Sequence, residues 1–134
     1  MTIDVLLVED NRADVVMLAE AIREAGLDYS VRVARDGREA LSFLDRQGSG
    51  ALPPPDMIIL DLNLPGIHGA DLLGSIRSQP ELREVPVVIL TTSAWKDTAA
   101  LLAAFDPEAF FQKPSLLTDW TTVAQGIETY RRRQ

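Results

Sequence analysis

Five side chains that can do ionic or phosphoryl chemistry follow apolar segments, at points where buried strands are expected to end. They are Glu9, Asp10, Asp61, Thr91 and Lys113. A hydroxyl or carboxylate at the end of a buried strand costs free energy unless it finds a partner. Because carboxylates that share one site repel one another and resist ionisation, their convergence requires a cation. The residue types therefore predict a site for a hard divalent cation.

The donor atoms in this group are oxygens, which favours Mg²⁺. In proteins Mg²⁺ is usually bound by one or two carboxylates, a carbonyl and waters, and it contacts phosphates at the same time. We expect Asp10 and Asp61 to be direct ligands and Glu9 to act through water. Asn63, two residues after Asp61, is expected to offer its backbone carbonyl.

Parallel strands must bring these residues to one edge of a sheet. Apolar runs rich in β-branched residues alternate with segments of helical period, which is typical of repeated βα units. We expect strands over residues 3–8, 29–35, 57–60, 85–90 and 109–113. Five such units predict an α/β fold with a doubly wound parallel sheet, in which ligands bind beyond the carboxyl ends of the strands.

Local signals mark where the first two helices begin and end. Asn11 is expected to cap the first helix, and Gly26 is expected to follow its end. Asp36 and Glu39 have the spacing of a capping box for the second helix.

Three further helices are predicted in the second half of the chain. The third helix follows LPGIHG, where Leu72, Leu73 and Ile76 have helical spacing. Residues 98–105 are predicted to form a fourth helix. This segment is apolar nearly all round, so part of it would stay exposed if it covers one sheet face. The fifth helix is predicted over residues 115–132, where apolar residues step by three or four: Leu116, Trp120, Val123, Ile127 and Tyr130.

Composition limits the classes of partner and compartment. The chain has 134 residues, 46% of them hydrophobic, which suits one compact domain. Its 13 basic and 20 acidic side chains give a net charge of −7, which argues against direct binding to nucleic acid. There is no cysteine, no apolar stretch of membrane-spanning length and no basic amino-terminal signal region. We therefore expect a soluble, cytoplasmic protein that does not enter a membrane.

Four motifs together resemble the receiver domain of two-component response regulators. They are VLLVEDN, DMIILDLNLPG, VVILTTS and FFQKP, and they occur in the order and at the strand positions of that family. The resemblance covers essentially the whole chain. It implies a flavodoxin-like receiver fold with five helices and the strand order 2-1-3-4-5. It also implies a single receiver domain over residues 1–134, with no output domain.

The resemblance assigns a role to each matching residue. Asp61 matches the phosphoacceptor, Lys113 the lysine that contacts the phosphate, and Thr91 the switch hydroxyl. Glu9 and Asp10 match the acidic pair that holds Mg²⁺. A carboxylate can attack a phosphoryl group when a metal ion and an ammonium offset the charge on the transferring oxygens.

Other matched positions lie near the phosphoacceptor. Phe110 matches the switch aromatic, and Pro114 stands where the family has a cis peptide bond. His68 departs from the pattern, because the family often has an acidic residue in the loop after the acceptor. We expect His68 to be an ordinary solvated loop residue.

The implied function is that of a single-domain response regulator and not of an enzyme with a separate substrate. Asp61 accepts a phosphoryl group from the phosphohistidine of a sensor histidine kinase or phosphotransfer protein, in a Mg²⁺-dependent reaction. Phosphorylation then changes the face formed by the fourth helix, the fifth strand and the fifth helix, through which we also expect a homodimer. The VEDN start and the loop GSGALPPPD resemble receivers paired with phytochrome-type sensor kinases.

Three other functions compete with this interpretation. A pseudo-receiver would only bind partners, but no member of the phosphorylation set is missing. A Mg²⁺-dependent aspartyl phosphatase usually has a second Asp two residues after the first, where this chain has Asn63. A flavodoxin-like cofactor site would need hydroxyls and backbone donors after the first strand, where this chain has acids.

Overall fold

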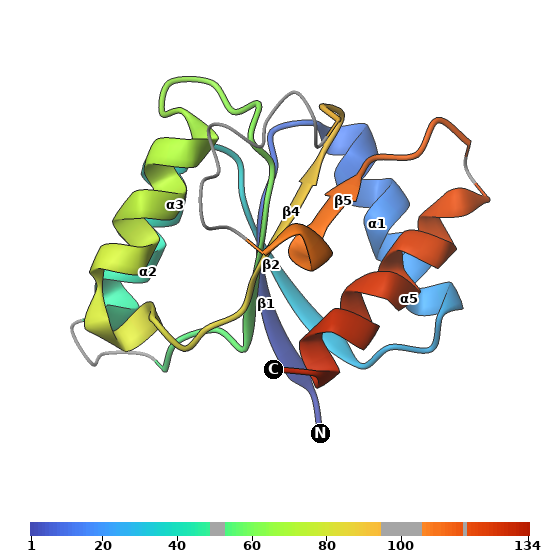
Figure 1. Ribbon diagram of the computed structural model, residues 1–134, viewed down its shortest axis with the longest axis horizontal. Helices are drawn as coiled ribbons and strands as arrows, with labels where there is room; N and C mark the ends of the chain where they lie inside the picture. Colours follow the sequence, from blue (N-terminus) through green and yellow to red (C-terminus); the bar gives the residue numbers. More distant parts are fainter. Residues whose placement is uncertain (49–52, 95–105, 117) are drawn as a thin grey trace.

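Five parallel strands form one sheet in the computed structural model, which describes residues 1–48, 53–94, 106–116 and 118–134 (Figure 1). The strands are β1 (Ile3–Val8), β2 (Tyr29–Ala34), β3 (Met57–Leu60), β4 (Val87–Thr91) and β5 (Phe110–Gln112). Their order across the sheet is β2-β1-β3-β4-β5. The predicted α/β fold and the strand order are therefore confirmed.

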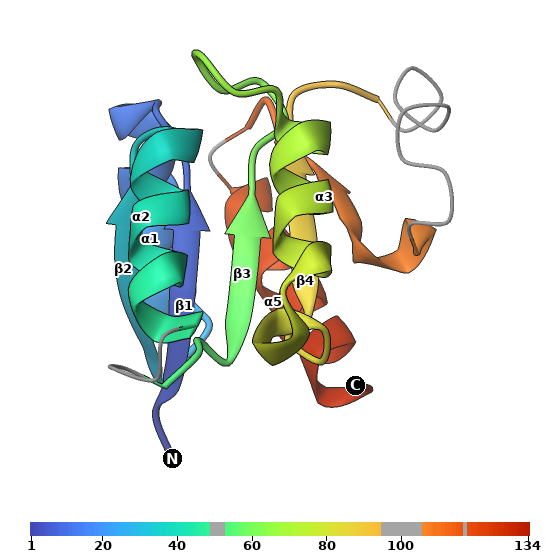
Figure 2. The ribbon, with the colours of Figure 1, turned by 90° about the vertical axis from the view of Figure 1, so that its left-hand side faces the viewer.

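Helices cover both faces of the sheet. They are α1 (Arg12–Glu24), α2 (Gly37–Gly48), α3 (Gly69–Ser78) and α5 (Asp119–Arg132), with the short 3-10 helices η1 (Pro80–Leu82) and η2 (Pro107–Ala109). In Figure 1, α2 and α3 lie on one side of the sheet while α1 and α5 lie on the other. Figure 2 turns the α2 and α3 side toward the reader. The helix predicted over residues 98–105 lies outside the described residues.

The core has two layers because successive side chains of a strand point to opposite faces of the sheet. In β1, Leu6 and Val8 pack in the cluster that includes α2 and α3, while Val5 and Leu7 pack in the cluster that includes α1 and α5. The strands β3 and β4 are buried along their whole length. Such strands are covered on both faces, as central strands of a parallel sheet are.

The predicted helix ends agree with the structure at α1 and α2. Asn11 Oδ1 accepts a hydrogen bond from the backbone N–H of Asp14 at 3.1 Å, at the start of α1. Gly26 follows that helix with a φ of 70°, a left-handed conformation that favours glycine. Asp36 Oδ1 accepts from the backbone N–H of Glu39 at 2.7 Å, which is one half of the predicted capping box.

The last helix begins later than predicted. It starts at Asp119, and Leu116 lies before it and is 64% exposed. The backbone N–H of Asp119 donates to the carbonyl of Leu116 at 3.2 Å, so the chain makes a turn where the apolar spacing alone predicts helix. The other members of the predicted stripe pack in the core: Trp120, Val123, Ile127 and Tyr130.

The first residue of α3, Gly69, lies against the loop that follows β3. A Cβ atom at this position would be 2.5 Å from the Cα of Leu62 and 2.9 Å from its carbonyl oxygen. We expect Gly69→Ala to lower the free energy of unfolding by about 2–3 kcal/mol, because backbone must move to admit the methyl group. Gly74→Ala, in the same helix but with no atom within 4 Å of its Cβ, should raise it by about 0.5–1 kcal/mol. Urea unfolding of both variants measures the difference, and equal effects would contradict the packing described for Gly69.

A carboxylate of α5, Glu128, joins this helix to β2. Its Oε1 accepts from the hydroxyl of Tyr29 at 2.7 Å and from Nε of Arg131 at 2.6 Å, and its Oε2 accepts from Nε of Arg132 at 2.9 Å. These bonds lower the pKa of Glu128 to about 2 from an ordinary value of 4.5, and the bond from Arg131 has the largest effect.

This lowered pKa makes the stability contribution of Glu128 depend on pH. A carboxylate whose pKa is lower in the folded state contributes fully above its unfolded pKa, and the contribution is lost as pH falls toward the folded value. We expect Glu128→Gln to cost about 1–2 kcal/mol at neutral pH and much less near pH 2. Urea unfolding across this pH range tests the prediction, with Glu84→Gln at an exposed acid as control. A difference from wild type that stays constant with pH would contradict it.

Candidate functional site

The five residues singled out above lie at the carboxyl edge of the sheet. Backbone hydrogen bonds continue the sheet one residue past β3 and β5, and they fix the positions of Asp61 and Lys113 at this edge. The N–H of Asp61 donates to the carbonyl of Val8 at 3.1 Å, which joins the ends of β3 and β1. The N–H of Lys113 donates to the carbonyl of Thr91 at 2.7 Å, which joins the ends of β5 and β4.

Three carboxylates converge at this edge. Ligand oxygens of Glu9, Asp10 and Asp61 all lie within 4.8 Å of one another. Glu9 and Asp61 are buried while Asp10 is exposed. Glu9 and Asp10 line a surface hollow of about 530 Å³, together with Arg12. The group therefore combines buried oxygens with access from solvent.

Burial and mutual repulsion change the acidity of this group. The pKa of Glu9 is raised to about 7, first by burial and then by the nearby charge of Asp61, although its hydrogen bond with Lys113 works in the opposite direction. An oxygen-only set of three carboxylates, one of them reluctant to ionise, fits a hard divalent cation, because such an ion offsets the repulsion. The residues present thus suit Mg²⁺ and similar ions.

The ammonium of Lys113 lies among the carboxylates. Its Nζ is 2.5 Å from Oε1 of Glu9, 2.8 Å from Oδ2 of Asp14 and 3.0 Å from Oδ2 of Asp61. Burial alone lowers the pKa of Lys113, but the bonds to Asp14, Glu9 and Asp61 outweigh it and raise the pKa above its ordinary value. Lys113 is therefore a fixed positive charge beside Asp61.

Asp14 was not predicted to belong to the site. It lies in the first turn of α1, and its carboxylate reaches Lys113. Side chains of a helix tilt toward its amino terminus, so an acid in the first turn after β1 points back toward the strand end. The sequence signal was the position of Asp14 four residues after Asp10.

Asn63 contacts the hydroxyl side of the site through its side chain. Its Nδ2 is 3.1 Å from Oγ1 of Thr91, 3.3 Å from Oγ1 of Thr92 and 3.4 Å from Oγ of Ser93. Its backbone N–H also donates to Oδ1 of Asp61 at 3.1 Å. Thr91 is fully buried, so Asn63 supplies the partner that a buried hydroxyl at this strand end requires.

Three further predicted positions, Phe110, His68 and Pro114, are described by the structure. Phe110 is partly buried and packs against the core cluster on the α2 and α3 side. His68 is exposed and precedes α3. No peptide bond among the described residues is cis, so the bond between Lys113 and Pro114 is trans. The cis bond implied by the resemblance is therefore absent from this structure.

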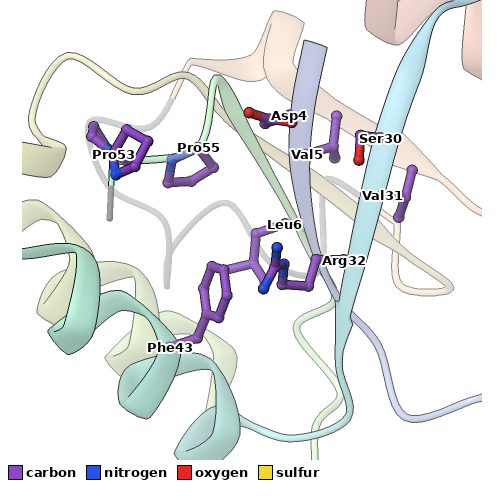
Figure 3. A pocket seen from close by; sticks show the side chains of 10 residues that line it. Asp4, Val5, Leu6, Ser30, Val31, Arg32, Phe43, Pro53 and Pro55 are labelled. Carbon is purple, nitrogen blue, oxygen red and sulfur yellow. The ribbon is translucent and has the colours of Figure 1, made fainter. Parts of the chain in front are cut away.

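A second hollow lies away from this edge, along the middle of β1 and β2 (Figure 3). It has a volume of about 320 Å³, and the prolines before β3 form one of its walls. Arg32 and Phe43 also line it, and the guanidinium of Arg32 stacks over the ring of Phe43 at 4.8 Å from the ring centre. The acids and the lysine of the carboxyl edge do not line this hollow, so it is separate from the candidate site.

A five-stranded sheet of this order, with acids and a lysine at its carboxyl edge, is the architecture of receiver domains. The family model described as the response regulator receiver domain matches residues 5–124, and the chain belongs to this family.

Individual relatives are similar over most of their length. Response regulator Rcp1 of Synechocystis is 36% identical over 127 residues, which cover 94% of this chain and 86% of that protein. The crystal structure of the phosphorylated cyanobacterial phytochrome response regulator RcpA has a TM-score of 0.80 at 34% identity, covering 98% and 95% of the two chains. The Mn²⁺-bound form of Rcp1 has a TM-score of 0.77 at 36% identity, covering 96% and 93%.

The acidic group and the metal-bound relative are consistent with divalent cation binding. Among the described residues, no helix combines the length and the apolar character needed to cross a membrane.

Proposed function

We propose that this chain is a cytoplasmic response regulator whose Asp61 accepts a phosphoryl group from a phosphohistidine. The observation that carries the proposal is the position of Lys113, whose ammonium lies 3.0 Å from the Asp61 carboxylate inside an acidic group. In the transfer, an oxygen of Asp61 bonds to phosphorus, the phosphorus–nitrogen bond of the donor breaks, and the imidazole leaves with the electron pair. Such transfer depends mainly on positioning and electrostatics.

The residues around Asp61 have complementary parts in this reaction. Lys113 holds Oδ2 of Asp61 and supplies positive charge for the transferring oxygens. The backbone N–H of Asn63 holds Oδ1, so the carboxylate has a fixed orientation before the donor arrives.

Mg²⁺ would be held directly by Asp10 and Asp61 and through water by Glu9, with the backbone carbonyl of Asn63 as a further ligand. When bound, it offsets negative charge on the acids and on the transferring phosphoryl group. We expect Mg²⁺ to raise the free energy of unfolding, by about 2.7 kcal/mol when its concentration is 100 times the dissociation constant. Thermal unfolding with and without Mg²⁺ measures this effect, and Asp10→Asn should reduce it. A melting temperature that does not change across millimolar Mg²⁺ would contradict the site.

We further propose that phosphorylation acts through Thr91 and Phe110 on a face that includes β5 and α5. The fourth helix predicted for this face, residues 98–105, lies outside the described residues. Thr91 is the last residue of β4 and is buried next to Asn63. Because β4 pairs with β5 in the sheet, a reorientation of Thr91 would affect β5. The same face is proposed to form a homodimer. Sedimentation with and without a phosphoryl mimic tests this, and a monomer at tens of micromolar in both states would contradict it.

The proposed donor is a sensor histidine kinase of the phytochrome type, or else a phosphotransfer protein. Support comes from the name of RcpA, which describes a phytochrome response regulator at 34% identity to this chain. Phosphoryl transfer from a purified phytochrome-type kinase, compared with an unrelated histidine kinase, tests the choice of partner. Equal rates with both kinases would contradict it.

A role as a phosphatase with its own substrate is less well supported by the geometry. The position two residues after Asp61, where such enzymes usually carry a second acid, is Asn63, and its amide is bonded to the hydroxyl of Thr91. This residue cannot act as a general acid or base. We therefore propose a phosphoacceptor that turns over only its own acyl phosphate.

Incubation with acetyl phosphate and Mg²⁺ tests the proposed function. Intact mass spectrometry should show the addition of one phosphoryl group, and neutral hydroxylamine should remove it, because an acyl phosphate is labile to this reagent. Omission of Mg²⁺ should strongly reduce the adduct. No adduct under any condition would instead support a pseudo-receiver that binds partners without phosphorylation.

A further inference from the structure

The ammonium of Lys113 has no hydrogen left for a phosphoryl group in this structure. A protonated lysine has three N–H donors. Its Nζ is within 3.0 Å of three carboxylates, which belong to Glu9, Asp14 and Asp61. One of these contacts must be released before Lys113 can donate to a phosphoryl oxygen, and the proposed transfer requires that donation.

The three contacts differ in how much it costs to release them. The side chains of Glu9 and Asp61 are 3% and 5% exposed, whereas that of Asp14 is 22% exposed. A carboxylate that loses its partner inside the protein pays a large desolvation cost, while one that can turn to water is solvated again. The contact with Asp14 is therefore the least costly to break.

Asp14 also differs from the other two in its place in the fold. It belongs to α1, whereas Glu9 and Asp61 directly follow strands. Its backbone N–H donates to the side-chain Oδ1 of Asn11, which caps the helix start. The carboxylate of Asp14 is not needed for this cap, and it contacts Lys113 instead.

We propose that Asp14 is a positioning residue that holds Lys113 in the unphosphorylated state and competes with the phosphoryl group for its ammonium. This inference rests on the proposed function of Asp61. Two effects act in the same direction. The carboxylate of Asp14 occupies a donor of Lys113, and its negative charge repels the incoming phosphoryl oxygens.

Asp14→Asn tests the competition with little change of shape. The variant removes the charge and keeps an oxygen at the same place. A matched control is Asp71→Asn, because Asp71 is an exposed acid in the first turn of α3. The control removes the same charge from the same helix position, and so it reproduces any effect on the helix dipole.

The first readout is the affinity for beryllofluoride, a mimic of the phosphoryl group, in saturating Mg²⁺. Charge-assisted hydrogen bonds are stronger than neutral ones, so removal of the competing carboxylate should tighten binding by about five- to tenfold. Asp71→Asn should bind within about twofold of wild type.

The second readout separates positioning from a purely structural role. The chain has two lysines, Lys96 and Lys113, so selective labelling of lysine side chains gives few NMR signals. Without beryllofluoride, Asp14→Asn should shift the side-chain signal of Lys113 and leave that of Lys96 in place. Asp71→Asn should shift neither signal.

The outcomes distinguish this inference from the function on which it rests. If wild type and Asp71→Asn fail to bind beryllofluoride, the proposed function fails and the inference fails with it. If both bind the mimic but Asp14→Asn binds it equally or more weakly, the competition is refuted and the phosphoacceptor stands. An unmoved Lys113 signal in Asp14→Asn would likewise refute the contact.

Discussion

Asp61→Asn is expected to abolish phosphorylation by acetyl phosphate while leaving the protein folded. An amide oxygen is a far weaker nucleophile than a carboxylate, and the variant cannot form an acyl phosphate. The fold should persist because the amide oxygen can still accept from the backbone N–H of Asn63, as Oδ1 of Asp61 does at 3.1 Å. Intact mass spectrometry after equal incubation of variant and wild type measures the loss.

The matched control for this variant lies at the opposite end of β3. Asp56 is exposed, precedes the strand, and accepts a hydrogen bond from the backbone N–H of Asp4 at 2.7 Å. Asp56→Asn removes the same charge and should be phosphorylated as wild type is. Phosphorylation of Asp61→Asn at the wild-type level would show that another residue is the acceptor.

Lys113→Met is expected to produce the largest loss of stability among the charge substitutions. The variant leaves Glu9 and Asp61 buried without the ammonium that compensates them, and the side chain of Lys113 is itself only 6% exposed. Removal of one partner from a buried ionic group typically costs about 3–5 kcal/mol. Urea unfolding at neutral pH without divalent cations measures this loss.

A second substitution shows whether uncompensated charge is the cause. Asp61→Asn in the Lys113→Met background removes a buried carboxylate left without a partner, so it should recover part of the lost stability. Mg²⁺ should also stabilise Lys113→Met more than wild type, because the ion replaces the missing positive charge. A stability of Lys113→Met within about 0.5 kcal/mol of wild type would contradict the ionic arrangement described here.

The sequence was informative where one physical requirement decides the structure. Strands β3 and β4 are buried on both faces, so their residues must be apolar, and the predicted strands 57–60 and 85–90 lie close to the observed ones. Parallel pairing then carries the residues that follow the strands to one edge. The sequence therefore predicts that Asp61 and Lys113 meet at this edge, as they do in the structure.

Prediction was less complete where competing contacts decide the outcome. Spacing places Asp14 in the first turn of α1, but its bond to Lys113 depends on where the loop after β5 passes. The backbone carbonyl of Asn63 stays a predicted Mg²⁺ ligand, but its spacing from Asp61 does not reveal that its side-chain amide bonds the hydroxyl of Thr91. Leu116 fits a helical stripe by spacing, yet the turn that precedes Asp119 excludes it from α5.

The assignment of Asp61 as the phosphoacceptor is tested most directly by locating the phosphoryl group in the wild-type chain. Reduction of the phosphorylated protein with borohydride converts an aspartyl phosphate to homoserine, which peptide mapping by mass spectrometry can place. We predict homoserine at position 61 and at no other acidic residue, and only after incubation with Mg²⁺ and a phosphoryl donor. Homoserine at Asp10 or at any other aspartate would contradict the assignment of Asp61. The same holds for 2-amino-5-hydroxypentanoic acid at Glu9, which is the product that this reduction gives from a glutamyl phosphate, and for a phosphoryl group on His68.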